Sequence, residues 1–249
     1  MTLRRVVAPE VLDHLAAADP AARRSRRDLR RVHRAMGTCA IVARGWQALW
    51  PSRRVTGPLQ ILEIGAGDGT LLLGVARRLA PAWPAVQLTL LDRQDIVSAA
   101  TQAAYAELGW TTRVEVTDVL DWVARGAAPA PGSAAGAPTW DLITTTLFLH
   151  HFEGAQLDAL LAAMASRSHR FFACEPRRAW PALAGSHLVG AIGANAVTRA
   201  DAVSSVRAGF RGRELSQRWP GTDRAWHADE YAAGLFSHCF GARRREAAA

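Results

Sequence analysis

Three glycines alternate with other residues in the segment that joins a short apolar run to an apolar helical pattern. Gly65, Gly67 and Gly69 follow directly on the run Leu59–Ile64 and precede the helical pattern 71–79. A strand that passes through such a loop into a helix is typical of a parallel α/β sheet, where the loop brings backbone N–H groups close to a ligand. The loop therefore predicts a Rossmann-like fold with a ligand site at the carboxyl edge of its sheet.

The spacing and charge of this loop distinguish between kinds of nucleotide ligand. The glycines are spaced GxGxG, whereas a dinucleotide-binding loop is usually GxGxxG. Asp68 lies inside the turn, where its charge would repel a pyrophosphate, and Glu63 stands just before the loop. Acids at these two positions suit a ligand that carries an ammonium and a sulfonium. An NAD-binding oxidoreductase is thus the less favoured alternative.

Short apolar runs alternate with helical patterns beyond the loop, which predicts βαβ units and a parallel sheet. The last two alternating runs, around 225–232 and 235–243, predict an antiparallel hairpin. The stretch 126–138 is rich in Ala, Gly and Pro and is expected to be an exposed loop. Further strands are expected at 87–91, 112–116, 141–145 and 170–174, and helices at 96–108 and 154–165.

The chain is expected to form one structural domain, because 249 residues with 49% hydrophobic content can bury a single large core. Residues 1–56 are expected to form an N-terminal helical cap with two or three helices. Residues 57–249 then form the core, with a lid insertion at 176–218. The insertion contains helical patterns at 181–192 and 199–210, and Thr198 followed by Asp201 has the form of a helix N-cap.

The net charge of +8 is concentrated near the N-terminus. Residues 1–54 hold 12 Arg against 4 acids, and the remaining residues hold 18 of each. Such a cluster could bind nucleic acid, but its arginines interleave with apolar residues as in a solvated amphipathic helix, and no nucleic-acid-binding motif accompanies them. We therefore expect no nucleic-acid partner.

Other features of composition narrow the class of protein. Cys39, Cys174 and Cys239 are scattered without metal-ligand spacing, so neither disulfides nor a metal site is predicted. No apolar run approaches a membrane span, and the N-terminal residues lack a secretory h-region, so we expect a soluble cytoplasmic protein. The apolar helical segment 40–49 could cover a cofactor or form the face of a homodimer.

Acidic residues follow two further predicted strands. Asp92 ends the second strand, 23 residues beyond Gly69, where a carboxylate can accept hydrogen bonds from ribose hydroxyls. Asp118 ends the third strand, where a short acid can face an adenine amino group. Each aspartate alone is a common turn former. Acids at three successive strand ends, Glu63 included, indicate an adenosyl ligand.

The segment 59–176 resembles the class I S-adenosylmethionine-dependent methyltransferases, on the motifs 62–69, 91–92, 117–119 and 140–152. The resemblance implies a seven-stranded, mostly parallel sheet with a C-terminal antiparallel hairpin, an N-terminal helical cap and a helical insertion after the fifth strand. It also implies that the glycine loop cradles the methionine part, that Asp92 binds ribose, and that Asp118 and Val119 border adenine. The expected cofactor-binding residues are Glu63, Gly65, Ala66, Gly67, Asp92, Arg93, Asp118, Val119, Thr145 and Thr146.

Two absences point to a branch of this family. The chain lacks the Asn/Asp-Pro-Pro-Tyr/Phe signature of enzymes that methylate base nitrogens, and it has no lysine, which metal-dependent catechol-type members use. The resemblance therefore implies metal-free SN2 transfer to a small molecule, favoured as a hydroxyl of a phenolic or polyketide-like metabolite. Carbon methylation of a similar metabolite and a non-catalytic, cofactor-binding partner subunit are the alternatives.

The candidate catalytic residues are His150, His151 and Glu175, because they follow the fourth and fifth predicted strands on the side where an acceptor must lie. His187 in the insertion is a weaker candidate. On a helix the consecutive histidines would point about 100° apart, so only one can face the site. The alternative for Glu175 is a salt bridge with Arg177 or Arg178. Arg30, Arg31 and His33 lie in a helix that could hold the cofactor carboxylate or be surface charge.

Overall fold

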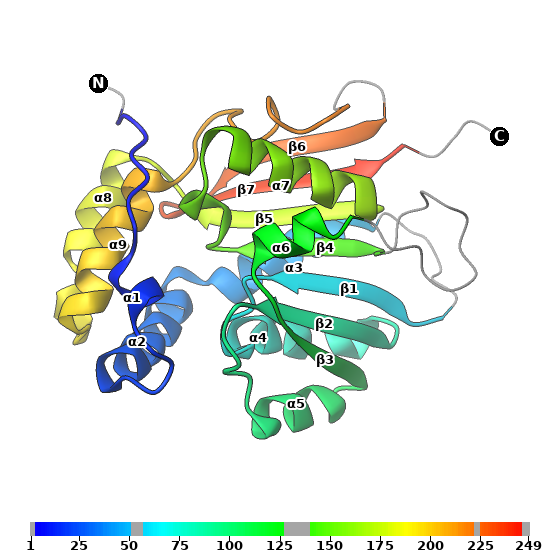
Figure 1. Cartoon of the computed structure of the whole chain (residues 1–249), viewed down its shortest axis with the longest axis horizontal. Helices are drawn as coiled ribbons and strands as arrows, with labels where there is room; N and C mark the ends of the chain where they lie inside the picture. Colours follow the sequence, from blue (N-terminus) through cyan, green and yellow to red (C-terminus); the bar gives the residue numbers. More distant parts are fainter. Residues whose placement is uncertain (1–2, 51–56, 127–139, 222–224, 246–249) are drawn as a thin grey trace.

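The computed structural model describes residues 3–50, 57–126, 140–221 and 225–245. One seven-stranded sheet runs through them in the order β3-β2-β1-β4-β5-β7-β6 (Figure 1). The first five strands are parallel, while β7 pairs antiparallel with both β5 and β6. This arrangement confirms the predicted fold class. The strands are β1 (Leu59–Ile64), β2 (Val86–Asp92), β3 (Trp110–Val116), β4 (Leu142–Thr146), β5 (Arg170–Pro176), β6 (Trp226–Ala233) and β7 (Ser237–Arg244).

The parallel strands lie where the sequence predicts them, with ends that differ by at most two residues. The predicted helix at 96–108 is shorter, because the Ser98 side chain caps the helix by accepting the N–H of Thr101. One short helix, α6 (Val119–Ala124), has no counterpart in the prediction, and Asp118 caps it by accepting the N–H of Leu120. The predicted loop at 126–138 lies, apart from its first residue, outside the described residues.

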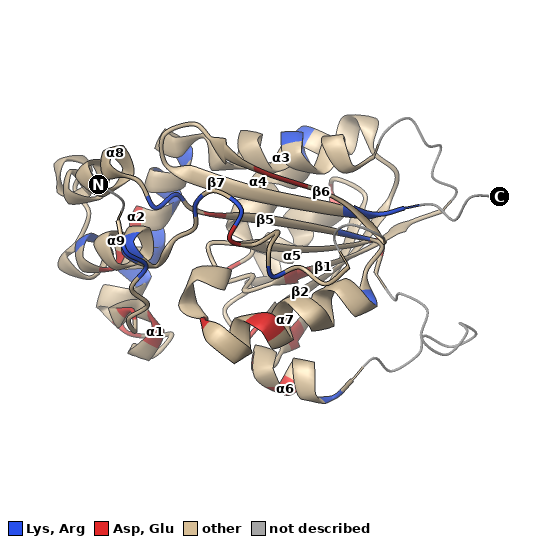
Figure 2. Cartoon of the chain, turned by 90° about the horizontal axis from the view of Figure 1, so that it is seen from above, with Lys and Arg blue, Asp and Glu red and all other residues tan. Residues whose placement is uncertain are grey.

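Helices cover both faces of the sheet, which explains why almost every residue of the central strands β1 and β4 is buried. Figure 2 shows α3 and α4 on one side of the sheet and α6 and α7 on the other. The first layer holds α3 (Thr38–Leu49), α4 (Thr70–Leu79), the short η1 (Ala80–Ala82) and α5 (Ala99–Ala106); the second holds α6 (Val119–Ala124) and α7 (Gly154–Arg167).

Helix α3 belongs to the core rather than to a free surface. Its Trp46 is fully buried, donates from Nε1 to Thr144 Oγ1 at 3.3 Å, and lies parallel to the ring of Trp110. Ile41, Val42 and Leu49 are buried in the same cluster. The apolar face of this helix therefore packs inside the protein and is not free to form a dimer interface. The homodimer itself stays a prediction.

Four helices gather beyond the carboxyl ends of the parallel strands (Figure 1). They are α1 (Val11–His14), α2 (Pro20–Met36), α8 (Trp180–His187) and α9 (Ala196–Ala208), with η3 (Val189–Ile192) between the last two. The predicted cap at Thr198 is wrong, because Asn195 caps α9 by accepting the N–H of Thr198, which lies within the helix. The predicted helix at 181–192 is also interrupted, at Leu188, where the chain turns into η3.

Helix α2 carries the arginine cluster on its solvent side. Arg23, Arg24, Arg27 and Arg34 are exposed, whereas Ala22, Ser25 and Asp28 are buried. This pattern is that of an amphipathic helix, as the sequence suggests. No helix in the described ranges is both long enough and apolar enough to cross a membrane.

We predict that Trp46→Ala lowers the free energy of unfolding by about 3–5 kcal/mol, because it leaves a large cavity and an unpaired Thr144 hydroxyl. Denaturant unfolding monitored by circular dichroism measures the change. Trp180→Ala is the matched control, since the Trp180 side chain is 56% exposed. An equal loss in both variants would contradict the assignment of Trp46 to the core.

Candidate active site

The glycine loop lies between β1 and α4 with a backbone that side chains would strain. Gly65 and Gly67 have φ of 75° and 55°. A Cβ at Gly65 would lie 2.3 Å from the ring of Phe148, so glycine is required for this close approach. A Cβ at Gly67 would meet nothing within 4 Å. The loop is thus packed against the protein at Gly65 and open toward a ligand at Gly67.

Asp92, at the end of β2, fixes this loop. Its Oδ2 accepts the N–H of Gly67 at 2.8 Å, and its Oδ1 accepts the N–H of Gln94 at 2.9 Å. A carboxylate has about four lone-pair sites, so two remain for a ligand. The side chain is only partly buried and lines a cavity. Asp92 is therefore held in place by the backbone while it still offers acceptors to a ligand.

The cavity at the carboxyl edge of the sheet has a volume of about 440 Å³. Two of the sequence-predicted residues do not line it. Thr145 and Glu175 are fully buried behind its wall. The sequence-predicted residues that do line it are Glu63, Gly65, Ala66, Gly67, Asp92, Arg93, Asp118, Val119, Thr146, His150 and His151.

Glu63 is a buried acid in this wall without an ion-pair partner. Burial, reinforced by the charges of Asp92 and Asp68, raises the pKa of Glu63 well above its usual range. Its Oε2 has no hydrogen-bond partner among the described residues. Burial therefore favours the protonated form of this carboxyl group, and Glu63 lines the cavity with its Oε2 unpartnered among the described residues.

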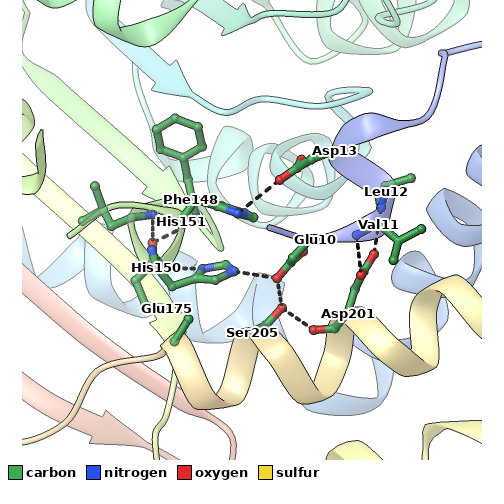
Figure 3. A network of polar contacts seen from close by, with 12 residues as sticks. Glu10, Val11, Leu12, Asp13, Phe148, His150, His151, Glu175, Asp201 and Ser205 are labelled. Atoms are coloured by element: carbon green, nitrogen blue, oxygen red, sulfur yellow. Dashed lines mark hydrogen bonds and ion pairs between the residues drawn. The ribbon is translucent and has the colours of Figure 1, made fainter. Parts of the chain in front are cut away.

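Glu175, at the carboxyl end of β5, holds the turn that follows β4. Its Oε1 accepts the N–H groups of Phe148 and Leu149 at 3.1 and 3.0 Å, and its Oε2 accepts the N–H of His150 at 3.3 Å (Figure 3). This turn contains the 3₁₀ helix η2 (Leu149–His151). Leu147, the first residue of the turn, has a φ of 55°. Glu175 fixes the backbone here, and the salt bridges with Arg177 or Arg178 considered for it are not formed.

His150 is a buried imidazolium. Its Nδ1 lies 2.9 Å from Glu175 Oε2 and its Nε2 lies 3.2 Å from Glu10 Oε1. Burial opposes the charge, but the hydrogen bonds to Glu10 and Glu175 outweigh it and raise the pKa of His150 to about 9. Both ring nitrogens thus donate to carboxylates at neutral pH. His150 has no free acceptor for a substrate proton.

His151 differs from its neighbour in burial and charge. Its side chain is 22% exposed and lines the cavity, with Nδ1 3.3 Å from Asp13 Oδ2. Burial and the positive charge of His150 lower the pKa of His151, against the opposing effect of Glu10, Asp13 and Glu175. His151 is therefore neutral at pH 7 and can accept a proton. Of the consecutive histidines, one is buried and charged, and the other is partly exposed and neutral.

The N-terminal segment supplies two acidic cavity residues that sequence reasoning missed, Glu10 and Asp13. The segment is held by Asp201 on α9, whose carboxylate accepts the N–H groups of Val11 and Leu12 at 2.8 and 3.0 Å (Figure 3). Asp201 thus caps the start of α1, a helix distant in sequence. Nothing in the local sequence around Glu10 and Val11 signals these contacts, because their partners, His150 and Asp201, both lie more than 130 residues away in the sequence.

Helix α2 brings part of the arginine cluster to the glycine loop. Arg30 forms a 2.8 Å salt bridge with Asp68, and both line the cavity. His33 lines it as well, and burial lowers the pKa of His33 to about 4 against the charge of Asp68. Arg31 instead points to Asp28 and to the carbonyl of Ile192. His187 lies exposed at the end of α8 and is not among the residues that line the cavity.

Glu10, His150 and His151 each offer one metal-ligand atom, and these atoms lie within 4.8 Å of one another. The proton on His150 already joins two members of this group, because Nε2 donates to Glu10. The positive charge of protonated His150 therefore already balances the negative charge of Glu10 within this cluster. The sequence prediction of no metal site stays a prediction.

No protein-family model matches the sequence, and no curated protein matches it. Solved structures do. The plantazolicin methyltransferase BpumL in complex with SAH superposes with a TM-score of 0.60 at 14% identity, over 92% of each chain. The chain has the fold of the class I methyltransferases. An O-methyltransferase family protein from Burkholderia thailandensis shares this methyltransferase fold, with a TM-score of 0.55 at 15% identity, over 91% of this chain and 61% of that one.

We predict that the buried imidazolium makes stability depend on pH above neutrality. The pKa of His150 is raised to about 9 from 6.5, so its contribution is complete below pH 6.5 and is lost as the pH rises through 9. The wild type should lose up to about 3 kcal/mol of unfolding free energy more than His150→Gln between pH 6.5 and 10. Urea unfolding at a series of pH values measures this difference. Parallel curves for the two proteins would contradict a charged His150.

Proposed function

We propose that this protein transfers a methyl group from S-adenosylmethionine to a hydroxyl of a small, phenolic or polyketide-like metabolite. One observation carries the proposal: a single cavity joins the glycine loop and Asp92 to the neutral imidazole of His151. A methyl donor and an acceptor can therefore meet inside one cavity. The structural neighbour BpumL, which was solved with SAH, supports the same cofactor class.

The residues at the glycine loop fit such a cofactor. Asp92 retains free lone pairs for ribose hydroxyls, and Gly67 leaves open space where the methionine part would lie. The Oε2 atom of Glu63, which has no hydrogen-bond partner among the described residues, is available to a polar group of the cofactor. Asp118 and Val119 stand at the end of β3, in the place proposed for adenine. Arg30 on α2 adds a cation to the same wall.

The part of the cavity around His151, the proposed acceptor site, is aromatic. Phe148 and Phe152 line it, with ring centroids 5.2 Å apart, and favour a flat apolar acceptor. His151 lines the same part of the cavity, and its neutral imidazole is available for the hydroxyl proton. His150 and Glu175 act behind it by fixing the turn on which His151 stands.

S-adenosylmethionine supplies an electrophilic methyl group on a sulfonium whose thioether is a good leaving group. The acceptor oxygen forms the new bond to the methyl carbon as the carbon–sulfur bond breaks in line with it. The hydroxyl proton passes to His151, which becomes an imidazolium, so charge balances when the sulfonium is consumed. Alignment and exclusion of water within the cavity supply most of the acceleration.

We predict micromolar binding of S-adenosylmethionine and S-adenosylhomocysteine and no binding of NAD. Asp92→Asn should weaken both adenosyl ligands by about 10-fold or more, because it replaces a charged acceptor by a neutral amide. Calorimetric titration measures the dissociation constants. Asp95→Asn is the matched control, since Asp95 is exposed and is not among the residues that line the cavity. If neither adenosyl ligand binds the wild type, the proposal fails.

We predict that His151→Gln lowers kcat for a hydroxyl acceptor by about 10²- to 10⁴-fold, because no other neutral imidazole with a free nitrogen is proposed at the acceptor. The affinity for S-adenosylmethionine should stay within twofold of the wild type. His187→Gln, an exposed change on α8, is the matched control. An acceptor screen by mass spectrometry provides the substrate. Full activity of His151→Gln would favour carbon methylation or another base.

A further inference from the structure

Asp13 lies between the two halves of the cavity on a segment remote from every motif. Its Oδ2 is 3.3 Å from His151 Nδ1, and its Oδ1 is 3.4 Å from Nη2 of Arg93, beyond the end of β2. The side chain is 40% exposed and lines the cavity. Asp13 thus joins α1 both to the proposed base and to the strand end that carries Asp92.

We propose that Asp13 is a positioning residue for His151: its carboxylate accepts the Nδ1–H and so leaves Nε2 unprotonated for the acceptor hydroxyl. This inference rests on the proposed function. When the acceptor proton is transferred to Nε2, Asp13 also stabilises the imidazolium that forms. No proton moves to Asp13 itself, and the proton on Nδ1 remains there throughout.

The tautomer follows from the hydrogen-bonding capacity of imidazole. A neutral imidazole carries one N–H and one acceptor nitrogen. A carboxylate at Nδ1 can only accept, so the proton of His151 must lie on Nδ1 when the two groups are bonded. Nε2 then carries the free lone pair. Without Asp13 the ring would distribute its proton between both nitrogens, and part of the population could not act as a base.

The charge of Asp13 offsets an unfavourable neighbour. The rings of His150 and His151 have centroids 4.2 Å apart, and His150 is already an imidazolium. A second positive charge on His151 is therefore opposed by His150 and favoured by Glu10, Glu175 and Asp13. Glu10 and Glu175 are both hydrogen-bonded to His150, whereas the Oδ2 atom of Asp13 lies 3.3 Å from Nδ1 of His151 itself. Arg93, whose Nη2 lies 3.4 Å from the other oxygen of Asp13, partly offsets the negative charge of this carboxylate.

Asp13 is held by contacts that do not involve His151. Asp201 on α9 accepts the first two N–H groups of α1, and Ser205 on the same helix donates to Glu10 (Figure 3). Arg5 donates to the carbonyl oxygens of Ala208 and Phe152, which fixes the preceding residues. The carboxylate is thus positioned by a segment attached to α9 and to η2. The N-terminal segment therefore completes the acceptor site in addition to covering it.

The first experiment is the pH dependence of kcat in the wild type, Asp13→Asn and Asp13→Glu. Removing the negative charge of Asp13 lowers the pKa of His151. The acidic limb of the pH profile of kcat should therefore lie about 0.5–1 pH unit lower in Asp13→Asn than in the wild type. The plateau kcat should fall by about 10-fold or more, while KM for S-adenosylmethionine stays within twofold. Asp13→Glu should restore part of the rate, and Asp95→Asn should change neither limb nor plateau. A lower plateau with an unshifted limb would mean that Asp13 only fastens α1, and would overturn the proposal.

A second measurement does not depend on activity. Two-dimensional ¹⁵N spectra of the imidazole nitrogens, with His151 assigned from the His151→Gln variant, report the tautomer directly. We expect the Nδ1–H form in the wild type and a mixture with Nε2–H in Asp13→Asn. An Nε2–H form in the wild type, or identical spectra in both, would overturn the role of Asp13. If S-adenosylmethionine does not bind the wild type, the proposed function fails, and the tautomer still decides whether Asp13 orients His151.

Discussion

The buried carboxylate of Glu175 is the interaction on which the acceptor half of the site depends. It accepts three backbone N–H groups and the imidazolium of His150, so β5 and the turn after β4 are joined by one side chain. Burying a charge is costly unless it is fully hydrogen-bonded. Here the cost of burying the Glu175 carboxylate is offset by three backbone N–H donors and by the positive charge of His150. Removing any member of this group would leave an unpaired charge in the interior.

The same group extends to the opposite end of the cavity. His150, which is hydrogen-bonded to Glu175, also donates from Nε2 to Glu10, and Glu10 in turn accepts a hydrogen bond from Ser205 on α9. The chain between Glu10 and Asp13 is then capped by Asp201 from the same helix. The position of the N-terminal segment over the cavity is therefore set by polar contacts rather than by apolar burial, since α1 contains no buried residue.

The sequence predicts the parts of this molecule that depend on local patterning. The glycine loop, the strand ends and the hairpin follow from periodicity and from spacing, and the seven-stranded fold is confirmed by the structure. Glu10 and Asp13 could not be found in this way, because the sequence around an acid near a short helix carries no signal for a partner some 140 residues away. The helix cap assigned to Thr198 is wrong for a related reason: the observed cap, Asn195, is held by α2, where Asp28 accepts its backbone N–H and the carbonyl of Ala21 accepts its side-chain amide.

Adjacent histidines with different charges follow from this arrangement. Two imidazoles with centroids 4.2 Å apart repel each other when both are protonated, so one proton is strongly favoured over two at neutral pH. Two carboxylates are hydrogen-bonded to His150, whereas His151 has one carboxylate, that of Asp13, 3.3 Å from its Nδ1, and this carboxylate also lies 3.4 Å from Arg93. The proton therefore remains on His150. His151 is left neutral on the rim of the cavity, and a buried ion network remote from the glycine loop thereby sets the protonation state on which the proposed chemistry depends.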